Sequence, residues 1–387
     1  MADPLRAAVA IAGVGEAGIG IAPEGSTPLD LIGEATAVAL DDAGLATTDV
    51  DALFTASAYY GMPNLNVGEY LGIRPRFSDS TNLGGASFLS HVGHAAAAIV
   101  SGLAEVALIV YGSTQRSDGG RLKSVAESFP DEQLYAPRYP VTQYALAAAR
   151  HMHEFGTTRE QLAAVAVAAR DWGRLNPAAF ARDPLTVDDV LSSRMLSAPL
   201  TVRDCCLVTD GAGALVVTSA ERARGLRGAG GGAIFVLGFG EAHWHRSISQ
   251  MPDLTVTAAT DSGARAYAMA GVGPGDVDVL ELYDAFTINP ILFLEDLGFC
   301  GKGEGGPFVA EGRTSPGGTH PVNTNGGGLS YCHPGMYGIF TLIEATRQLR
   351  GEAGDRQVPG AEIALAHGNG AVLSAQSTVI LGTDAAA

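Results

Sequence analysis

Two stretches that lie far apart in the chain repeat the same pattern, and this repeat constrains the fold more than any other feature. Residues 43–53, AGLATTDVDAL, match residues 270–280, AGVGPGDVDVL, with Ala-Gly, Asp-Val-Asp and the final leucine in register. In each copy a helix is expected to end at the glycine and a strand to begin after Asp-Val-Asp. Self-similarity of this kind predicts two equivalent halves that arose by gene duplication.

The motifs that follow each copy are also shared. NLGGAS at 82–87 matches NGGGLS at 325–330, and EVALIVYG at 105–112 matches EIALAHG at 362–368. Each half therefore has the order helix, strand, glycine-rich loop, helix, buried strand. Apolar strands that alternate with helices are typical of α/β sheets covered by helices on both faces.

The length of 387 residues exceeds the size at which a single core stops growing. We expect an N-terminal half over residues 1–228 and a C-terminal half over residues 229–387. A segment at about residues 114–200 interrupts the N-terminal half, and an excursion this long is usually functional. Its arginines are expected to supply a basic patch for an anionic cofactor tail: Arg116, Arg121, Arg138, Arg150, Arg170 and Arg174.

Composition excludes several classes of protein. The formal net charge of -17 argues against nucleic-acid binding, which needs clustered Lys and Arg. The N-terminal run lacks the features of a secretory signal and no stretch has the apolar length of a membrane span, so we expect a cytoplasmic protein without membrane contact. The four cysteines suit neither a disulfide framework nor a zinc site, and no metal is expected.

Four motifs, in this order along the chain, resemble the thiolase superfamily: PLTVRDCCLVTDGAGALVVTS, ELYDAFT, NTNGGGLSYCHPGMYG and ALAHGNG. The chain is most similar to the sterol-carrier-protein-x-type thiolases and to the aldolases that descend from them. The resemblance implies an α/β thiolase fold, in which two duplicated αβαβα halves form five layers. It also implies a homodimer, and a loop domain inserted in the first half that binds coenzyme A.

The cysteines that such thiolases use are absent at their expected positions. The slot of the nucleophilic cysteine, at the start of the helix that Gly102 ends, is occupied by Gly85. The motif His-Asp-Cys-Phe of the sterol-carrier type is here Tyr283 to Phe286, and the other family position for an acid/base cysteine is His367. The covalent thiolase route therefore cannot run in this chain.

Tyrosines stand where the resemblance leads us to expect catalytic groups. Steroid side-chain aldolases of the superfamily have a Tyr-Asp-x-Phe tyrosine and a Tyr-x-His tyrosine, which here are Tyr283 and Tyr331, followed by His333. Phenols and an imidazole suit a retro-aldol cleavage, which needs a base, an acid and donors to an enolate oxygen. Four further residues are candidates for the pocket or its oxyanion hole: Gly85, His367, Gly368 and Asn369.

The resemblance implies that the substrate is a β-hydroxyacyl-CoA, in particular a steroid side-chain CoA thioester that yields a ketone and propionyl-CoA or a related acyl-CoA. No cofactor is expected, because the substrate itself carries coenzyme A. Related aldolases also require an OB-fold partner, carried as a separate protein or on a hydratase chain, and we expect one here.

Two alternatives remain open. The first is an acyl-CoA acyltransferase with an unusual nucleophile, Ser87 or Cys332, although a first-turn role for Ser87 and simple packing for Cys332 are favoured. The second is a non-catalytic subunit that binds lipid or acyl-CoA. Asp284 is expected to bond backbone in a turn, and His367 either assists proton transfer or caps the turn that follows it.

Overall fold

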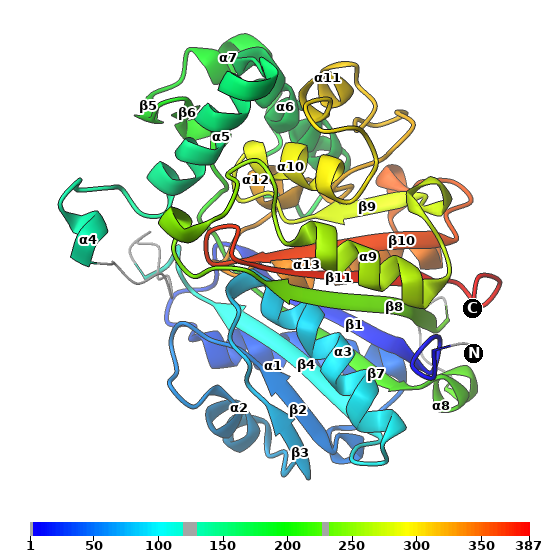
Figure 1. Ribbon diagram of the computed structural model, residues 1–387. Helices are drawn as coiled ribbons and strands as arrows, with labels where there is room; N and C mark the ends of the chain where they lie inside the picture. Colours follow the sequence, from blue (N-terminus) through cyan, green and yellow to red (C-terminus); the bar gives the residue numbers. More distant parts are fainter. Residues whose placement is uncertain (1–2, 119–129, 227–231) are drawn as a thin grey trace.

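The computed structural model describes residues 3–118, 130–226 and 232–387 and has one large mixed sheet at its centre (Figure 1). The boundary expected at residue 228 and the side chain of Arg121 lie outside these residues. The strand order across the sheet is β3-β2-β4-β7-β1-β8-β11-β10-β9. These strands are β1 (Val9–Gly20), β2 (Ala52–Thr55), β3 (Phe77–Asp79), β4 (Val106–Ser113), β7 (Asp210–Ser219), β8 (Ile234–His243), β9 (Val279–Leu282), β10 (Ile363–Gly370) and β11 (Ala375–Gly382).

The strand order is symmetric about the seam between β1 and β8. From the seam outward, β1, β7, β4 and β2 correspond to β8, β11, β10 and β9, and β3 corresponds to a parallel bridge between Leu280 and Val322. At the seam itself, β1 and β8 are paired through Ala10 with Phe235 and through Ile11 with Ile234. The duplicated halves expected from the sequence repeat are therefore present.

Helices occupy equivalent places in the two halves. α1 (Pro28–Ala43) packs on β1 and β7, and α9 (Ala259–Ala270) packs on β8 and β11. Glycines in the strands permit this close approach, because a Cβ on Gly13 would lie 2.1 Å from the carbonyl oxygen of Ala39, and one on Gly238 would lie 2.3 Å from that of Ala266. α3 (Ser87–Val100) and α13 (Gly338–Arg350) contact each other and strands of both halves, which makes them the central helical layer.

The segment between β4 and β7 forms a helical region above the C-terminal half (Figure 1). Its helix α6 contacts α11 and α12, and its helix α5 contacts α10, so the segment is docked on the second half of the chain. None of the helices formed by the described residues has the combined length and apolar character that crossing a bilayer requires. The remaining elements are α2 (Pro63–Leu71), α4 (Pro130–Gln133), α5 (Val141–Phe155), α6 (Arg159–Leu175), α7 (Val187–Leu191), β5 (Met195–Ser197), β6 (Leu200–Thr201), α8 (Ala220–Gly225), α10 (Ile288–Asp296), α11 (Gly305–Ala310) and α12 (Gly327–Ser330).

Candidate active site

A cavity of about 230 Å³ lies where the two halves and the inserted segment meet. Its wall is formed by five parts of the chain. These are the residues just before α3, the start of α5, the residues just after β9, the loop before α13, and the turn between β10 and β11. The lining residues are Gly84, Gly85, Pro140, Val141, Tyr144, Leu196, Cys205, Cys206, Val208, Tyr283, Ala285, Phe286, His333, Gly335, Met336, Asn369, Ala371 and Val372.

The ring of Tyr283 occupies the space next to Gly85. A Cβ on Gly85 would lie 1.9 Å from Cε2 and 2.6 Å from Cζ of Tyr283, and 2.8 Å from the backbone oxygen of Asn369. No residue larger than glycine fits at position 85 unless the phenol ring moves. The slot that the sequence comparison assigned to a nucleophile is thus filled from the other half of the chain by an aromatic side chain.

The hydroxyl of Tyr283 lies in a short hydrogen-bond network. It is 3.1 Å from Nε2 of His333 and 3.3 Å from the carbonyl oxygen of Gly335, and it accepts the Tyr337 N–H at 3.2 Å. Burial raises the pKa of Tyr283 well above its usual value, while the Tyr337 N–H acts in the opposite direction. Burial lowers the pKa of His333 to about 4. At neutral pH the pair therefore consists of a protonated phenol and a neutral imidazole, the form of histidine that can accept a proton.

Tyr331 does not join this pair. The prediction that its phenol and that of Tyr283 meet in the active site is therefore wrong. Its side chain is 1% exposed, lies outside the cavity lining and packs edge-on against Phe340, with Glu16 and Arg347 near its hydroxyl. Tyr331 ends the short helix α12, with its N–H bonded to the carbonyl oxygen of Gly327. The side chains of residues 331 and 333 would point to the same side only in an extended strand. The chain turns here, so they point in different directions.

Strand alternation separates the three residues of the His-Gly-Asn motif on β10. Asn369 lines the cavity. Gly368 faces the other way, where a Cβ would lie 2.6 Å from Leu89 on α3. His367 is on the same side as Asn369 but is completely enclosed, with its ring nitrogens 2.9 Å from Oε1 of Gln376 and 2.9 Å from Oγ1 of Thr378. His367 therefore lies behind the cavity wall, and burial lowers its pKa to about 3.

The turn and packing residues lie as expected. The carboxylate of Asp284 accepts the N–H groups of Gly328 at 2.6 Å and Leu329 at 3.3 Å, which caps α12. Oγ of Ser87 accepts the Leu83 N–H at 2.7 Å in the first turn before α3. Cys332 is fully buried and is not part of the cavity lining.

Two thiols to which the sequence motifs did not point lie in the cavity wall. Cys205 and Cys206 follow the inserted segment and line the cavity together with Tyr283. Burial raises the pKa of Cys205 to about 12 and that of Cys206 well above its usual value. Since the thiolate is the nucleophilic form, these cysteines are poorly prepared for attack on a thioester.

Tyr144 is a second phenol in the cavity that the sequence analysis missed. It is carried by α5, its ring stacks on Phe286 at 4.2 Å between centroids, and its hydroxyl donates to the carbonyl oxygen of Ala371 at 2.9 Å. The hydroxyl oxygen of Tyr144 in turn accepts Nδ2–H of Asn369 at 2.8 Å. A periodic signal was present, because Tyr144, Ala147, Ala148 and His151 recur at helical spacing and are all buried.

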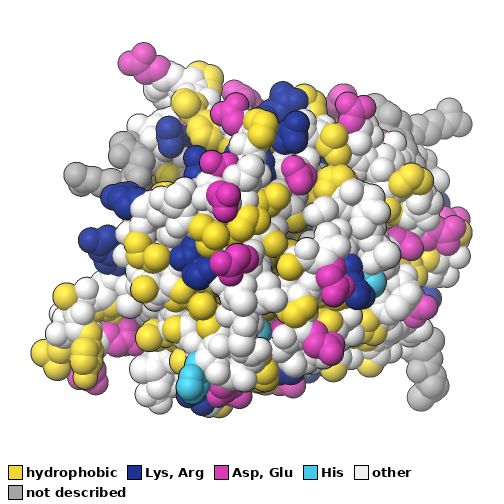
Figure 2. Space-filling view, turned by 90° about the horizontal axis from the view of Figure 1, so that it is seen from above, with side chains coloured by type: hydrophobic (Ala, Val, Ile, Leu, Met, Phe, Trp, Pro, Cys, Tyr) yellow, Lys and Arg dark blue, Asp and Glu magenta, His cyan; other side chains and the backbone are white. Residues whose placement is uncertain are grey.

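Three of the described arginines of the inserted segment make their contacts within the protein. Arg150 and Arg174 pair with acidic neighbours on their own helices, while Arg170 is buried and donates to Ser330 and to the Asp183 carbonyl oxygen. On the face seen in Figure 2, Lys and Arg side chains lie interspersed with Asp and Glu side chains. Within the described ranges, His, Cys, Asp and Glu side chains form no group of three suited to a metal ion.

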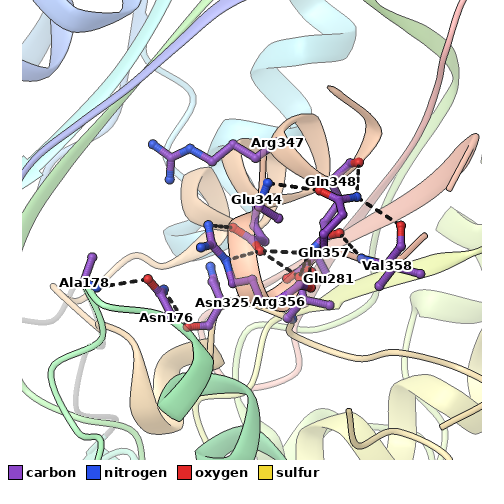
Figure 3. Close-up of polar contacts among 12 residues, drawn as sticks. Asn176, Ala178, Glu281, Asn325, Glu344, Arg347, Gln348, Arg356, Gln357 and Val358 are labelled. Carbon is purple, nitrogen blue, oxygen red and sulfur yellow. Dashed lines mark hydrogen bonds and ion pairs between the residues drawn. The ribbon is translucent and has the colours of Figure 1, made fainter. Parts of the chain in front are cut away.

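A buried polar cluster anchors β9 two residues before Tyr283 (Figure 3). Glu344 receives two hydrogen bonds from Arg356, at 2.8 and 2.9 Å, as an ionised carboxylate does. Oγ1 of Thr324 is 2.9 Å from Oε1 of Glu281 and 2.8 Å from Oε1 of Glu344. A hydroxyl has only one proton to donate, so both contacts can be hydrogen bonds only if one of the two carboxyl groups carries a proton itself. Burial and the nearby Glu344 charge raise the pKa of Glu281 well above its usual value, so Glu281 is the member that carries a proton.

Comparison with known proteins places this fold and site in a family. The thiolase C-terminal domain-like family matches residues 240–383. The chain is 35% identical to an acetyl-CoA acetyltransferase of Methanothermobacter thermautotrophicus, with 88% of this chain and 91% of the relative covered. The chain belongs to the thiolase superfamily.

Aldolases of this superfamily are similar over the whole length. A steroid side-chain-cleaving aldolase of Thermomonospora curvata is 34% identical, with 98% of this chain and 99% of the relative covered. The solved structure described as Ltp2-ChsH2(DUF35) aldolase is 33% identical with a TM-score of 0.88, and 98% of this chain and 99% of that chain are covered. The thiolase fold and the relation to steroid aldolases that the motifs implied are therefore confirmed.

Proposed function

We propose that this protein is a carbon-carbon lyase that cleaves a β-hydroxyacyl-CoA by a retro-aldol reaction. The substrate is a steroid side-chain CoA thioester, and the products are a ketone and a short acyl-CoA such as propionyl-CoA. The observation that carries the proposal is the phenol of Tyr283, which fills the space beside Gly85 and is hydrogen-bonded to His333 inside the cavity. Full-length similarity to a steroid side-chain-cleaving aldolase supports the substrate class.

The Tyr283 and His333 pair supplies the proton transfers that this reaction needs. The substrate hydroxyl gives its proton to Tyr283, whose own proton passes to Nε2 of the neutral His333. The O–H electron pair forms the carbonyl of the ketone, the bond between the α and β carbons breaks, and its electrons move onto the thioester oxygen. Tyr283 then protonates the α carbon and regains a proton from His333. The proton lost by oxygen is gained by carbon, so the cycle closes without a cofactor.

A homodimer with an OB-fold partner completes the proposal. β3 lies at the edge of the sheet. Beside β2, Met62 at the start of α2 and Leu65 within it are 67% and 66% exposed, which suits a surface covered by a second subunit. The similar structure described as Ltp2-ChsH2(DUF35) aldolase supports a partner protein. Activity should therefore be measured with and without a co-purified partner of that kind.

An acyl-CoA acyltransferase is the second candidate, because a similar relative has that name and two thiols line the cavity. The nucleophiles first considered, Ser87 and Cys332, are fully buried. Loss of activity on alkylation cannot separate the candidates, since a group added to Cys206 blocks the cavity in either case. Intact-mass detection of an acyl-enzyme after incubation with acyl-CoA, absent in Cys206→Ala, would support the acyltransferase.

The test of the lyase uses a panel of β-hydroxyacyl-CoAs, including steroid thioesters, with product detection by mass spectrometry. Wild-type protein is expected to release a ketone and a shorter acyl-CoA, and Tyr283→Phe is expected to abolish this release while the circular dichroism spectrum stays unchanged. Tyr267→Phe removes a phenol on the outer helix α9 and serves as the matched control. Cleavage that persists in Tyr283→Phe would refute the assignment.

A further inference from the structure

We infer that Tyr144, carried by the inserted segment, is the hydrogen-bond donor that stabilises the thioester oxyanion. The inference rests on the proposed lyase reaction, in which electrons from the broken carbon-carbon bond collect on the thioester oxygen. Tyr283 and His333 are occupied by proton transfer, so a separate donor has to face that oxygen. Tyr144 is the other phenol in the cavity lining.

The hydroxyl of Tyr144 is held in a fixed position. Its ring is 2% exposed and stacked on Phe286, which restricts its rotation. Its oxygen accepts Nδ2–H of Asn369 at 2.8 Å, and its proton is donated to the carbonyl oxygen of Ala371 at 2.9 Å. A donor that is already oriented before the reaction costs little reorganisation when charge develops.

Asn369 is itself oriented by a chain of buried side chains. Its Oδ1 accepts Nε2–H of Gln376 at 2.9 Å, which leaves the Asn369 amide N–H directed at Tyr144. Oε1 of Gln376 lies 2.9 Å from Nε2 of His367, so that nitrogen carries the proton. Nδ1 of His367 then accepts from Oγ1 of Thr378 at 2.9 Å. Every polar atom named in this chain is paired, as expected for an arrangement that specifies one geometry.

The state of the Tyr144 hydroxyl suits donation rather than proton transfer. Burial raises its pKa far above neutrality, so the phenol stays protonated. The N–H that it accepts from Asn369 withdraws electron density from the oxygen and strengthens the O–H as a donor. When the thioester is bound, its oxygen replaces the Ala371 carbonyl as acceptor, and the bond strengthens as the oxygen becomes negative.

Tyr144 and Tyr283 reach the cavity from different elements of the fold. The two hydroxyls address one substrate from different walls, Tyr283 from the residue that follows β9 and Tyr144 from α5.

The experiment compares wild type, Tyr144→Phe and the control Tyr267→Phe in two assays. The first measures kcat and KM for cleavage. The second measures deuterium uptake at the α carbon of propionyl-CoA in D2O, which reports enolate formation without cleavage. Tyr144→Phe retains the ring that stacks on Phe286 and loses the hydroxyl alone, so folding should be unchanged. We expect kcat and the exchange rate to fall about 100-fold, with KM within about threefold of wild type.

The possible results separate the two proposals. If Tyr144→Phe cleaves and exchanges at wild-type rates, or raises KM with kcat unchanged, the oxyanion role is overturned while the lyase stands. If wild type exchanges the α proton of propionyl-CoA but cleaves no hydroxyacyl-CoA, the lyase is refuted, and the effect of Tyr144→Phe on exchange still decides its role. If wild type does neither, both proposals are refuted.

Discussion

Replacing Gly85 by alanine tests directly whether the Tyr283 ring fills the slot beside it. The new Cβ would lie 1.9 Å from Cε2 of Tyr283, which is about 1.6–2.1 Å closer than the separation of about 3.5–4.0 Å at which carbon atoms make favourable contact. The backbone oxygen of Asn369, at 2.8 Å on another side, limits the space into which the Cβ could move. Overpacking of this kind costs about 1–3 kcal/mol of stability.

The decisive measurement is a double-mutant cycle with Tyr283→Ala. That single change leaves a cavity and costs about 3–5 kcal/mol, as truncation of a buried aromatic residue does. In the double variant the Cβ at position 85 occupies part of the vacated space, so the combined loss should be smaller than the sum by about 1–2 kcal/mol. Gly275→Ala is the control, because a Cβ there meets nothing within 4 Å.

Stability in this cycle is followed by guanidinium denaturation with circular dichroism, and the midpoints and slopes of all variants are compared. Loss of cleavage in Gly85→Ala should accompany the shift in midpoint, because the displaced ring takes the Tyr283 hydroxyl away from His333. Additive effects within about 0.5 kcal/mol would refute the reasoning, since residues that do not touch show no coupling.

Two further predictions concern residues outside the cavity. Tyr331→Phe should leave the cleavage rate within about threefold of wild type, because its phenol lies outside the cavity wall; a loss as large as that expected for an active-site donor, about 100-fold, would restore the role assigned from the motif. Glu281 keeps its proton in the folded state above its usual pKa of 4.5, so the wild type loses stability as pH rises from there toward the raised pKa. Glu281→Gln removes this loss and should raise the denaturation midpoint more at pH 8 than at pH 5; an equal change at both pH values would contradict a protonated Glu281.

The sequence predicted the architecture because the repeat has a direct structural counterpart. Gly44 and Gly271 end α1 and α9 with positive φ angles of 66° and 72°, and β2 and β9 follow at equivalent places in the sheet. Motif positions also predicted that Tyr283 and His333 belong to one site, and their side chains meet at 3.1 Å. The prediction of the architecture succeeded because local motifs fix the ends of strands and helices.

Side-chain direction in turns and docking of the insertion could not be predicted in the same way. Tyr331 was assigned to the site from its resemblance to the Tyr-x-His motif of the steroid side-chain aldolases. A motif does not fix side-chain direction where the chain turns, because only regular structure sets that direction from sequence position. Tyr144 was missed because the helical pattern predicts only that its side chain is buried. The pattern does not predict that the side chain packs against the active-site cavity. Its contact with Asn369 joins residues far apart in sequence, and only tertiary packing brings them together.

The walls of the cavity come from three separate stretches of chain: Gly85 from the first half, Tyr144 from the insertion, and Tyr283, His333 and Asn369 from the second half. During synthesis the last of these leaves the ribosome only after the other two stretches have been made. The first half supplies Gly85 but none of Tyr283, His333 and Asn369, which all come from the second half. Catalysis in this molecule therefore begins only after the second half has docked, and a fragment that ends before β10 should be inert, however well it folds.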